Sequence, residues 1–296
     1  MKVREGCFVL MLICAVPLST AGQDTTTTTQ SPPVKAGRNV FDLTFGSFEA
    51  NPNRPSSSNS ADVLAPGELQ LEYGFSRDWG TDHDRQNLLG GELRVGVWRN
   101  IELRWGGNSF VENESPGSNE QGFGDQYLSA QYRFHEQTEE IPALALSYAI
   151  KFPTGDESRG LGSGRTDHAF TFLASKDIHK ITIDFNAGYQ LVGQEGADGY
   201  NQNAATILTF SRTLYGPLTG MAEISSETRL GDQPAFATTL WGLSWRVRRQ
   251  LVLDSAIDVG ITKGAPHKRI LFGLTYAIAR IHSRQQRGSQ KGGKGR

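Results

Sequence analysis

The stretch ITIDFNAGYQL, residues 181–191, alternates large apolar side chains with small or polar ones along its whole length. Successive side chains of a β-strand point to opposite faces, so this alternation predicts a strand with one apolar and one polar face. Its length matches the roughly 9–11 residues that a tilted strand needs to cross a bilayer, whereas ordinary globular strands have about 5–6. The stretch therefore indicates a strand that spans a membrane.

The same alternation recurs from Gly67 to about residue 280, in about twelve segments of about 9–12 residues. The connections between segments alternate between long and short: 153–166 is followed by Asp177-Ile178-His179, and 192–201 by Tyr215-Gly216-Pro217. Long loops at one end and tight turns at the periplasmic end are typical of bacterial outer-membrane barrels. An even number of strands also returns both termini to the periplasm. We therefore predict an all-β fold, a transmembrane up-and-down antiparallel β-barrel of about 12 strands over residues 67–280.

Two soluble folds share this alternation, a lipocalin-like barrel and a β-sandwich. A soluble barrel turns its apolar face inward, and eight strands already enclose an interior that side chains fill. About twelve strands enclose a larger lumen, which water and polar groups fill more readily than apolar side chains do. After the N-terminal segment, no stretch approaches 18 consecutive apolar residues, so a closed barrel is the membrane-spanning structure that the sequence allows.

Residues 1–21 have the features of a secretory signal peptide. Lys2 and Arg4 precede an apolar run from Cys7 to Leu18, and Ser19-Thr20-Ala21 supplies the small residues that a signal peptidase reads. The apolar run is shorter than the roughly 20 residues of a transmembrane helix, and a retained anchor helix is the alternative interpretation. We expect cleavage near Ala21 and localisation in the outer membrane of a Gram-negative bacterium.

The segments on either side of the barrel are poor in apolar residues. Residues 22–66 contain the run Thr25–Thr29, Pro32-Pro33 and a Pro/Asn/Ser tract, and they cannot bury enough apolar surface to offset their chain entropy. We expect a mostly disordered periplasmic leader here, with the alternating island Val40–Phe45 as a candidate short plug. Residues 281–296 carry five basic residues and no acid, which predicts a basic disordered tail.

With the apolar face toward lipid, the other face of each strand lines the lumen. The lumen-lining candidates on this register are Glu72, Glu92, Arg94, Glu102, Arg104, Lys151, Asp184, Glu223, Asp254 and Asp258. Charged rings of this kind set the field that a permeant ion meets, and their acidic excess disfavours anions. In the alternative interpretation, pairs such as Glu92 with Arg94 and Glu102 with Arg104 join across the lumen and hold it rigid or shut. Both interpretations stay open.

The residues that carry chemistry in enzymes are not arranged as a catalytic or metal site. The Gly-rich segment 153–166 lacks the Gly-Lys-Ser/Thr ending and the following helix of a phosphate-binding loop. The acid-flanked His83 and His168 have no identifiable catalytic partner, and the six histidines lack metal-ligand spacing. Both cysteines, Cys7 and Cys14, lie in the signal peptide. We expect no enzymatic activity, no metal, no other cofactor and no nucleic-acid partner.

Three groups of motifs lie outside this account: Asn53-Arg54-Pro55 with Leu64–Glu72, Gly122-Phe123-Gly124-Asp125, and Lys151–Gly155 with the Gly-rich segment after it. They resemble motifs of the outer-membrane transporter family associated with the MetA-pathway of phenol degradation. The family-motif residues of the third group are Pro153, Thr154, Gly155, Gly162, Gly164 and Asp167. The resemblance covers about residues 50–280 and implies an outer-membrane barrel that passes small, often hydrophobic or aromatic, compounds.

These observations predict a porin-like channel for the passive uptake of such compounds. Its partners would be outer-membrane lipid, the barrel-assembly machinery and a small-molecule solute. The alternative is a plugged barrel without transport, which has a structural or surface-interaction role and makes its contacts through the long loops 108–122 and 153–166.

Overall fold

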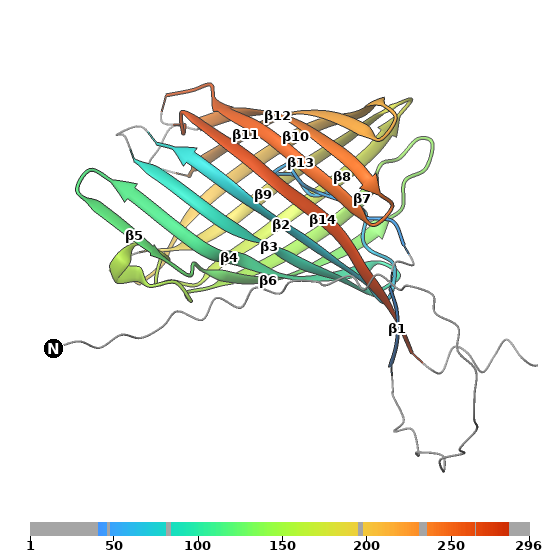
Figure 1. Cartoon of the computed structure of the whole chain (residues 1–296), viewed down its shortest axis with the longest axis horizontal. Helices are drawn as coiled ribbons and strands as arrows, with labels where there is room; N and C mark the ends of the chain where they lie inside the picture. Colours follow the sequence, from blue (N-terminus) through green and yellow to red (C-terminus); the bar gives the residue numbers. More distant parts are fainter. Residues whose placement is uncertain are drawn as a thin grey trace, which may run out of the picture. The chain divides into compact units, whose positions relative to one another are not determined.

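The computed structural model describes residues 41–45, 48–80, 84–194, 198–230, 236–263 and 265–283. In this part of the chain, twelve antiparallel strands form a closed barrel (Figure 1). The barrel strands are β2 (Glu68–Trp79), β3 (Arg85–Trp98), β4 (Ile101–Ser115), β6 (Gln126–His135), β7 (Ala143–Phe152), β8 (Asp167–Ile178), β9 (Ile181–Gly193), β10 (Tyr200–Tyr215), β11 (Leu218–Arg229), β12 (Phe236–Arg248), β13 (Leu251–Gly260) and β14 (Lys268–Ser283). The predicted fold class and strand number are confirmed.

The barrel closes where its last strand pairs with its first. The β14–β2 pairing runs from Lys268 opposite Trp79 to Arg280 opposite Glu68. All other barrel strands pair with their neighbours along the chain, so every strand has a partner on both sides. Closure matters because lipid offers no hydrogen-bond partner to the open edge of a sheet.

Two short strands extend this sheet beyond the barrel wall. Strand β5 (Ser118–Gly122) folds back on β4, so that much of the predicted loop 108–122 is a β-hairpin. Strand β1 (Phe41–Phe45) pairs with the C-terminal end of β14, from Phe41 opposite Ser283 to Phe45 opposite Ala279.

Most connections alternate in length as the sequence indicates, but the connection 136–142, at the end with the short turns, contains seven residues. Four turns at one end contain two residues each: 99–100, 179–180, 216–217 and 249–250. The connections at the opposite end are longer, and the longest described one, 153–166, contains the 3-10 turn η1 (Glu157–Arg159). Among the described residues, no helix is long and apolar enough to cross a bilayer. The predicted signal peptide (1–21) and most of the predicted tail (281–296) lie outside the described residues.

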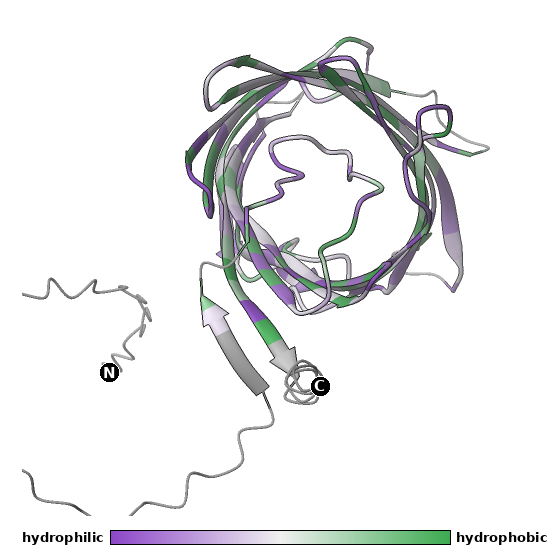
Figure 2. Cartoon of the chain, turned by 90° about the vertical axis from the view of Figure 1, so that its right-hand side faces the viewer, coloured by the Kyte–Doolittle hydropathy of each residue, from purple (hydrophilic) through white to green (hydrophobic). Residues whose placement is uncertain are grey.

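The segment before β2 differs from the sequence expectation. Residues 22–66 were expected to form a mostly disordered leader, yet residues 48–66 lie inside the ring of strands (Figure 2). We call residues 48–66 the strap. The composition of the strap indicates disorder because it offers few apolar groups to bury. Its polar groups instead bind polar groups of the inner wall, as described below.

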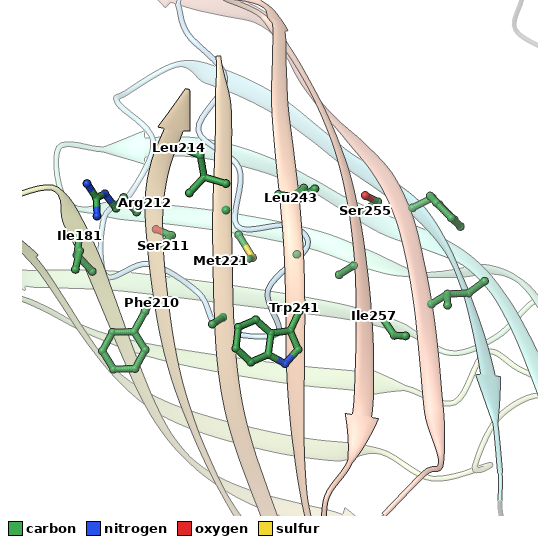
Figure 3. Close-up of a pocket in the computed structure, with 16 residues that line it drawn as sticks. Ile181, Phe210, Ser211, Arg212, Leu214, Met221, Trp241, Leu243, Ser255 and Ile257 are labelled. Atoms are coloured by element: carbon green, nitrogen blue, oxygen red, sulfur yellow. The ribbon is translucent and has the colours of Figure 1, made fainter. Parts of the chain in front are cut away.

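The outer face of the barrel is apolar. Large side chains that a soluble protein would bury are exposed there, among them Leu146 (53%), Trp241 (60%) and Phe272 (54%). A shallow apolar groove of about 720 Å³ crosses β10 to β14 on this face, and Phe210, Trp241 and Ile257 line it (Figure 3). An exposed apolar band around a closed barrel is the surface that meets lipid. The groove therefore belongs to the lipid-facing surface rather than to the lumen.

A charge on this outer face should destabilise the barrel in proportion to its depth in the bilayer. Ile224→Arg, in the middle of β11, should lower the free energy of unfolding by about 2–4 kcal/mol, and Tyr215→Arg, at the end of β10, by about 0–1 kcal/mol. Denaturant titration of the protein folded into lipid vesicles measures both values. Equal costs at the two positions would contradict a lipid-facing outer surface.

Candidate functional site

The strap enters and leaves the lumen at the end that carries the two-residue turns. The N–H of Ala50 donates to the carbonyl of Arg249 at 2.8 Å, and Arg246 Nη1 donates to the carbonyl of Ala50 at 3.0 Å. At its other end, Gly67 N–H donates to Gly96 at 2.7 Å and leads directly into β2. Between these two anchors the strap forms a loop inside the lumen (Figure 2).

The wall supplies acceptors for the backbone of the strap. A side-chain oxygen from β2, β4, β8, β9 or β11 accepts a strap N–H at 2.7–3.2 Å in each of these pairs: Asn51 with Gln70, Asn53 and Arg54 with Glu72, Ser57 with Glu223, Asn59 with Asn186, Ala61 with Ser175, and Leu64 with Glu102. Buried backbone groups need such partners. An irregular segment is therefore stable inside the barrel without a strand or helix of its own.

Five predicted lumen residues form one ion network on β2, β3 and β4. Arg94 lies 2.6 Å from Glu72 and 2.8 Å from Glu102, and Arg104 lies 2.7 Å from Glu102 and 3.6 Å from Glu92. The side chains of Arg94 and Glu102 are fully buried. Arg94 Nη1 also donates to the carbonyl of Asn51 at 2.9 Å, which ties the network to the strap.

The acids on the opposite wall are bound differently. Glu223 accepts hydrogen bonds from the Ser56 hydroxyl, from Ser57 N–H at 3.0 Å and from the Thr209 hydroxyl at 3.0 Å. Asp184 accepts a hydrogen bond from Ser175, and Asp258 from Thr238. All of these donors are neutral, and none of the three acids forms an ion pair with a Lys or Arg among the described residues.

Arg54 and Asp254 form an ion pair between the strap and β13. Arg54 Nη2 lies 3.3 Å from Asp254 Oδ1 and donates to the carbonyl of Phe272 at 3.2 Å. Asp254 was among the predicted lumen residues and Arg54 was not. Arg54 lies in the Asn53-Arg54-Pro55 motif, but the sequence contains no signal that this motif lies inside the barrel.

The family-motif residues shape the loop 153–166 around one acid, Asp125. Its carboxylate accepts Gly155 N–H at 2.9 Å and Ser163 N–H at 3.1 Å, and it lies 3.2 Å from Lys151 Nζ. A Cβ at Gly162 would come within 2.4 Å of the same carboxylate, so only glycine fits there. Asp125 was not predicted as a site residue, although it ends the second family motif.

The other family-motif residues complete this loop. Pro153 follows β7 directly, and the Thr154 hydroxyl donates to the carbonyl of Gly124 at 3.1 Å. Gly164 has a φ of +65°, which favours glycine. Asp167 lies 2.5 Å from Lys151 Nζ and accepts Gly193 N–H at 2.9 Å. The predicted residues therefore act together in positioning a loop.

Two cavities lie in the lumen on opposite sides of the strap. The outer cavity, toward the long loops, has a volume of about 490 Å³ and includes Asp78, Leu88, Tyr127, Lys151 and Leu161 in its lining. The inner cavity, toward the short turns, has a volume of about 450 Å³ and includes Asp62, Lys176, Asp184 and Arg246. Arg54 lines both. Within the described residues, no group of three or more His, Cys, Asp or Glu could hold a metal ion.

The model of the family described as "Putative MetA-pathway of phenol degradation" matches residues 52–215. The chain belongs to this family. The match begins within the strap and ends with the last residue of β10. The protein is therefore a closed twelve-strand β-barrel of the phenol-degradation MetA family.

Solved structures with a similar arrangement of strands are outer-membrane barrels, whereas no curated protein sequence matches the chain. The NanC porin is 9% identical, with 70% of this chain and 98% of that chain covered and a TM-score of 0.49. The translocator domain of the autotransporter NalP from Neisseria meningitidis is 12% identical, with 73% and 90% covered and a TM-score of 0.45. Outer membrane phospholipase A from Escherichia coli is 11% identical, with 75% and 94% covered and a TM-score of 0.42.

The ion network should contribute strongly to stability because its charges are buried together. Arg94→Met leaves Glu72 without its closest cation and removes one of the two cations beside Glu102, so unfolding in lipid vesicles should become easier by about 3–5 kcal/mol. Arg159→Met is the control, since it breaks a pair with Glu120 in which both side chains are over a third exposed, and it should cost about 0.2–1 kcal/mol. Similar costs for the two variants would show that the network is not a buried structural unit.

Proposed function

We propose that this protein is a channel through which small solutes cross the outer membrane by diffusion. The observation that carries this proposal is the pair of cavities in the lumen, one toward each end of the barrel, which have Arg54 of the strap as a common lining residue. A single segment without regular structure separates them, rather than a folded plug domain. The proposal includes no enzymatic step.

The outer cavity supports a solute of limited size with an apolar part. Its volume of about 490 Å³ lies within the range of small-molecule sites, about 300–1,000 Å³. Leu88, Leu161 and Leu271 contribute apolar surface, and Asp78, Tyr127 and Lys151 contribute polar groups. The family description is in keeping with small aromatic compounds, which combine both kinds of surface.

The charge of the lumen supports a preference for cations over anions. Asp184, Glu223 and Asp258 are hydrogen-bonded to hydroxyl groups rather than neutralised by a Lys or Arg at contact distance. Fixed charges along a pore attract ions of the opposite sign. The same acids would leave a neutral solute unaffected.

The remaining expectations on export and partners are part of the proposal. Residues 1–21 would direct export and be removed near Ala21, and the barrel-assembly machinery would insert the barrel into outer-membrane lipid. The Gram-negative origin agrees with the family and the fold.

A barrel without transport is the second candidate, and the rigidity of the surface loops favours it. Arg159 lies 2.7 Å from Glu120, and Asn113 donates to the carbonyl of Gly160 at 2.8 Å, so the β4–β5 hairpin and the loop 153–166 form one surface. Such a surface suits contacts with other molecules outside the cell.

Electrical recordings separate the two candidates. Purified wild-type protein in planar bilayers should give discrete conductance steps. Leu88→Trp should lower the step size, because the larger side chain fills part of the outer cavity. Leu89→Trp should leave the step size unchanged, because the neighbouring residue of a strand points to the opposite face, here toward lipid. Silence of the folded wild-type protein at all voltages would contradict the channel and favour the second candidate.

A further inference from the structure

Arg54 lies at the seam where the barrel closes. Gly74 of β2 and Gly273 of β14 are opposite each other in the β14–β2 pairing. A Cβ at Gly74 would come within 2.3 Å of Arg54 Nη2, and a Cβ at Gly273 within 2.4 Å of Arg54 Nε. The two glycines therefore form a notch in the inner wall that the guanidinium group occupies.

The ion-pair contacts of the guanidinium group are longer than those of Arg94, Arg104 and Arg133. Its nitrogens lie 3.3 and 3.4 Å from Asp254, whereas the closest ion-pair contacts of Arg94, Arg104 and Arg133 are 2.6–2.7 Å. The Arg54 side chain is 20% exposed, and that exposure is to the cavities, while the Asp254 side chain below it is fully buried. Moving this side chain breaks these contacts and leaves the buried Asp254 carboxylate without its cation, so the displaced position is the minor state.

We propose that the Arg54 side chain is the gate between the outer and inner cavities. With the guanidinium group in the notch, the side chain separates the cavities and covers Asp254. When it swings out, the cavities join while the backbone of the strap stays bound to the wall. The inference rests on the proposed channel function and names the residue that regulates it.

In the open state, a negative charge lies at the constriction between the cavities. The departure of the guanidinium group leaves the Asp254 carboxylate at the constriction without its cation, with Glu72 also nearby. An uncompensated carboxylate at the narrowest point of a pore attracts cations and repels anions. The Arg54–Asp254 pair therefore sets both how often the pore is open and which ions pass through it.

Planar-bilayer recordings of the full mature barrel in potassium chloride test this gate. Arg54→Ala should raise conductance and shift the reversal potential in a salt gradient toward that of potassium. Arg54→Ala combined with Asp254→Asn should keep the higher conductance and lose the shift. Arg159→Ala is the control: it removes an arginine of the loop 153–166 that pairs with Glu120 and is not among the residues lining either cavity, so conductance should stay at the wild-type value.

Gly273→Ala tests the gate with Arg54 still present. The three atoms nearest to the added methyl group all belong to the flexible Arg54 side chain, so the methyl group should displace the guanidinium group rather than the strands. Conductance should rise, although a methyl group added to a pore wall would ordinarily narrow the pore. A fall in conductance would overturn the proposal, and this variant remains decisive if Arg54→Ala fails to fold.

A disulfide distinguishes a moving side chain from a moving strap. The hydroxyl oxygens of Ser58 and Thr209 lie 2.9 Å apart, so Ser58→Cys with Thr209→Cys should cross-link the strap to β10. In the oxidised protein, Arg54→Ala should still raise conductance. Loss of the effect on oxidation, with recovery on reduction, would show that the strap leaves the lumen and would overturn the side-chain gate. If the wild type conducts and neither Arg54→Ala nor Gly273→Ala changes its conductance, the gate is refuted but the channel is not. If the wild type and every variant are silent, the channel itself is refuted.

Discussion

Every part of this structure depends on the need of the backbone for hydrogen-bond partners where water is scarce. In the wall, the need is met by the closed sheet, and the pairing of β14 with β2 removes the last open edge. In the lumen, the strap has no sheet to join, and carboxylates, amides and hydroxyls of the wall accept its N–H groups one by one. The polar inner face of the barrel and the path of the strap are therefore two consequences of one constraint.

The strap is held mainly by polar contacts, and small apolar contacts add to them. Phe48, Ala50 and Leu64 pack with Val252 and Ala277 where the strap enters and leaves. Ala61 packs with Ala143, Ala145 and Leu173 farther along. These clusters are small because the large apolar side chains face lipid. A segment with few apolar residues can be ordered here, since its partners are polar groups that would otherwise be unsatisfied or hydrated.

The barrel contains a chain segment and still has open space in its lumen. A single segment bound along the wall leaves space on both sides, and the two cavities contain a similar volume. Tight pairs such as Arg94 with Glu102 preserve the structure, whereas the longer Arg54–Asp254 contact lies where the cavities meet. The short, buried ion pairs therefore lie in the wall network, whereas the longer Arg54–Asp254 pair lies between the cavities.

The sequence by itself determined the barrel, the number of strands, the placement of long and short connections, and which side chains lie on each face. These features follow from local alternation and length, because a strand that crosses a bilayer must present an apolar residue at every second position. Glu72, Glu102 and Glu223 could be placed on the inner face for this reason.

Only the tertiary structure decided what those residues bind. The strap has no regular alternation and few apolar residues, so criteria based on burying apolar surface predict disorder for it. Its order comes from partners far away in the sequence: Ser57 meets Glu223, and Arg54 meets Asp254 across a notch between Gly74 and Gly273. Contacts of this kind arise only when twelve strands close around a common lumen, and no local pattern of residues records them.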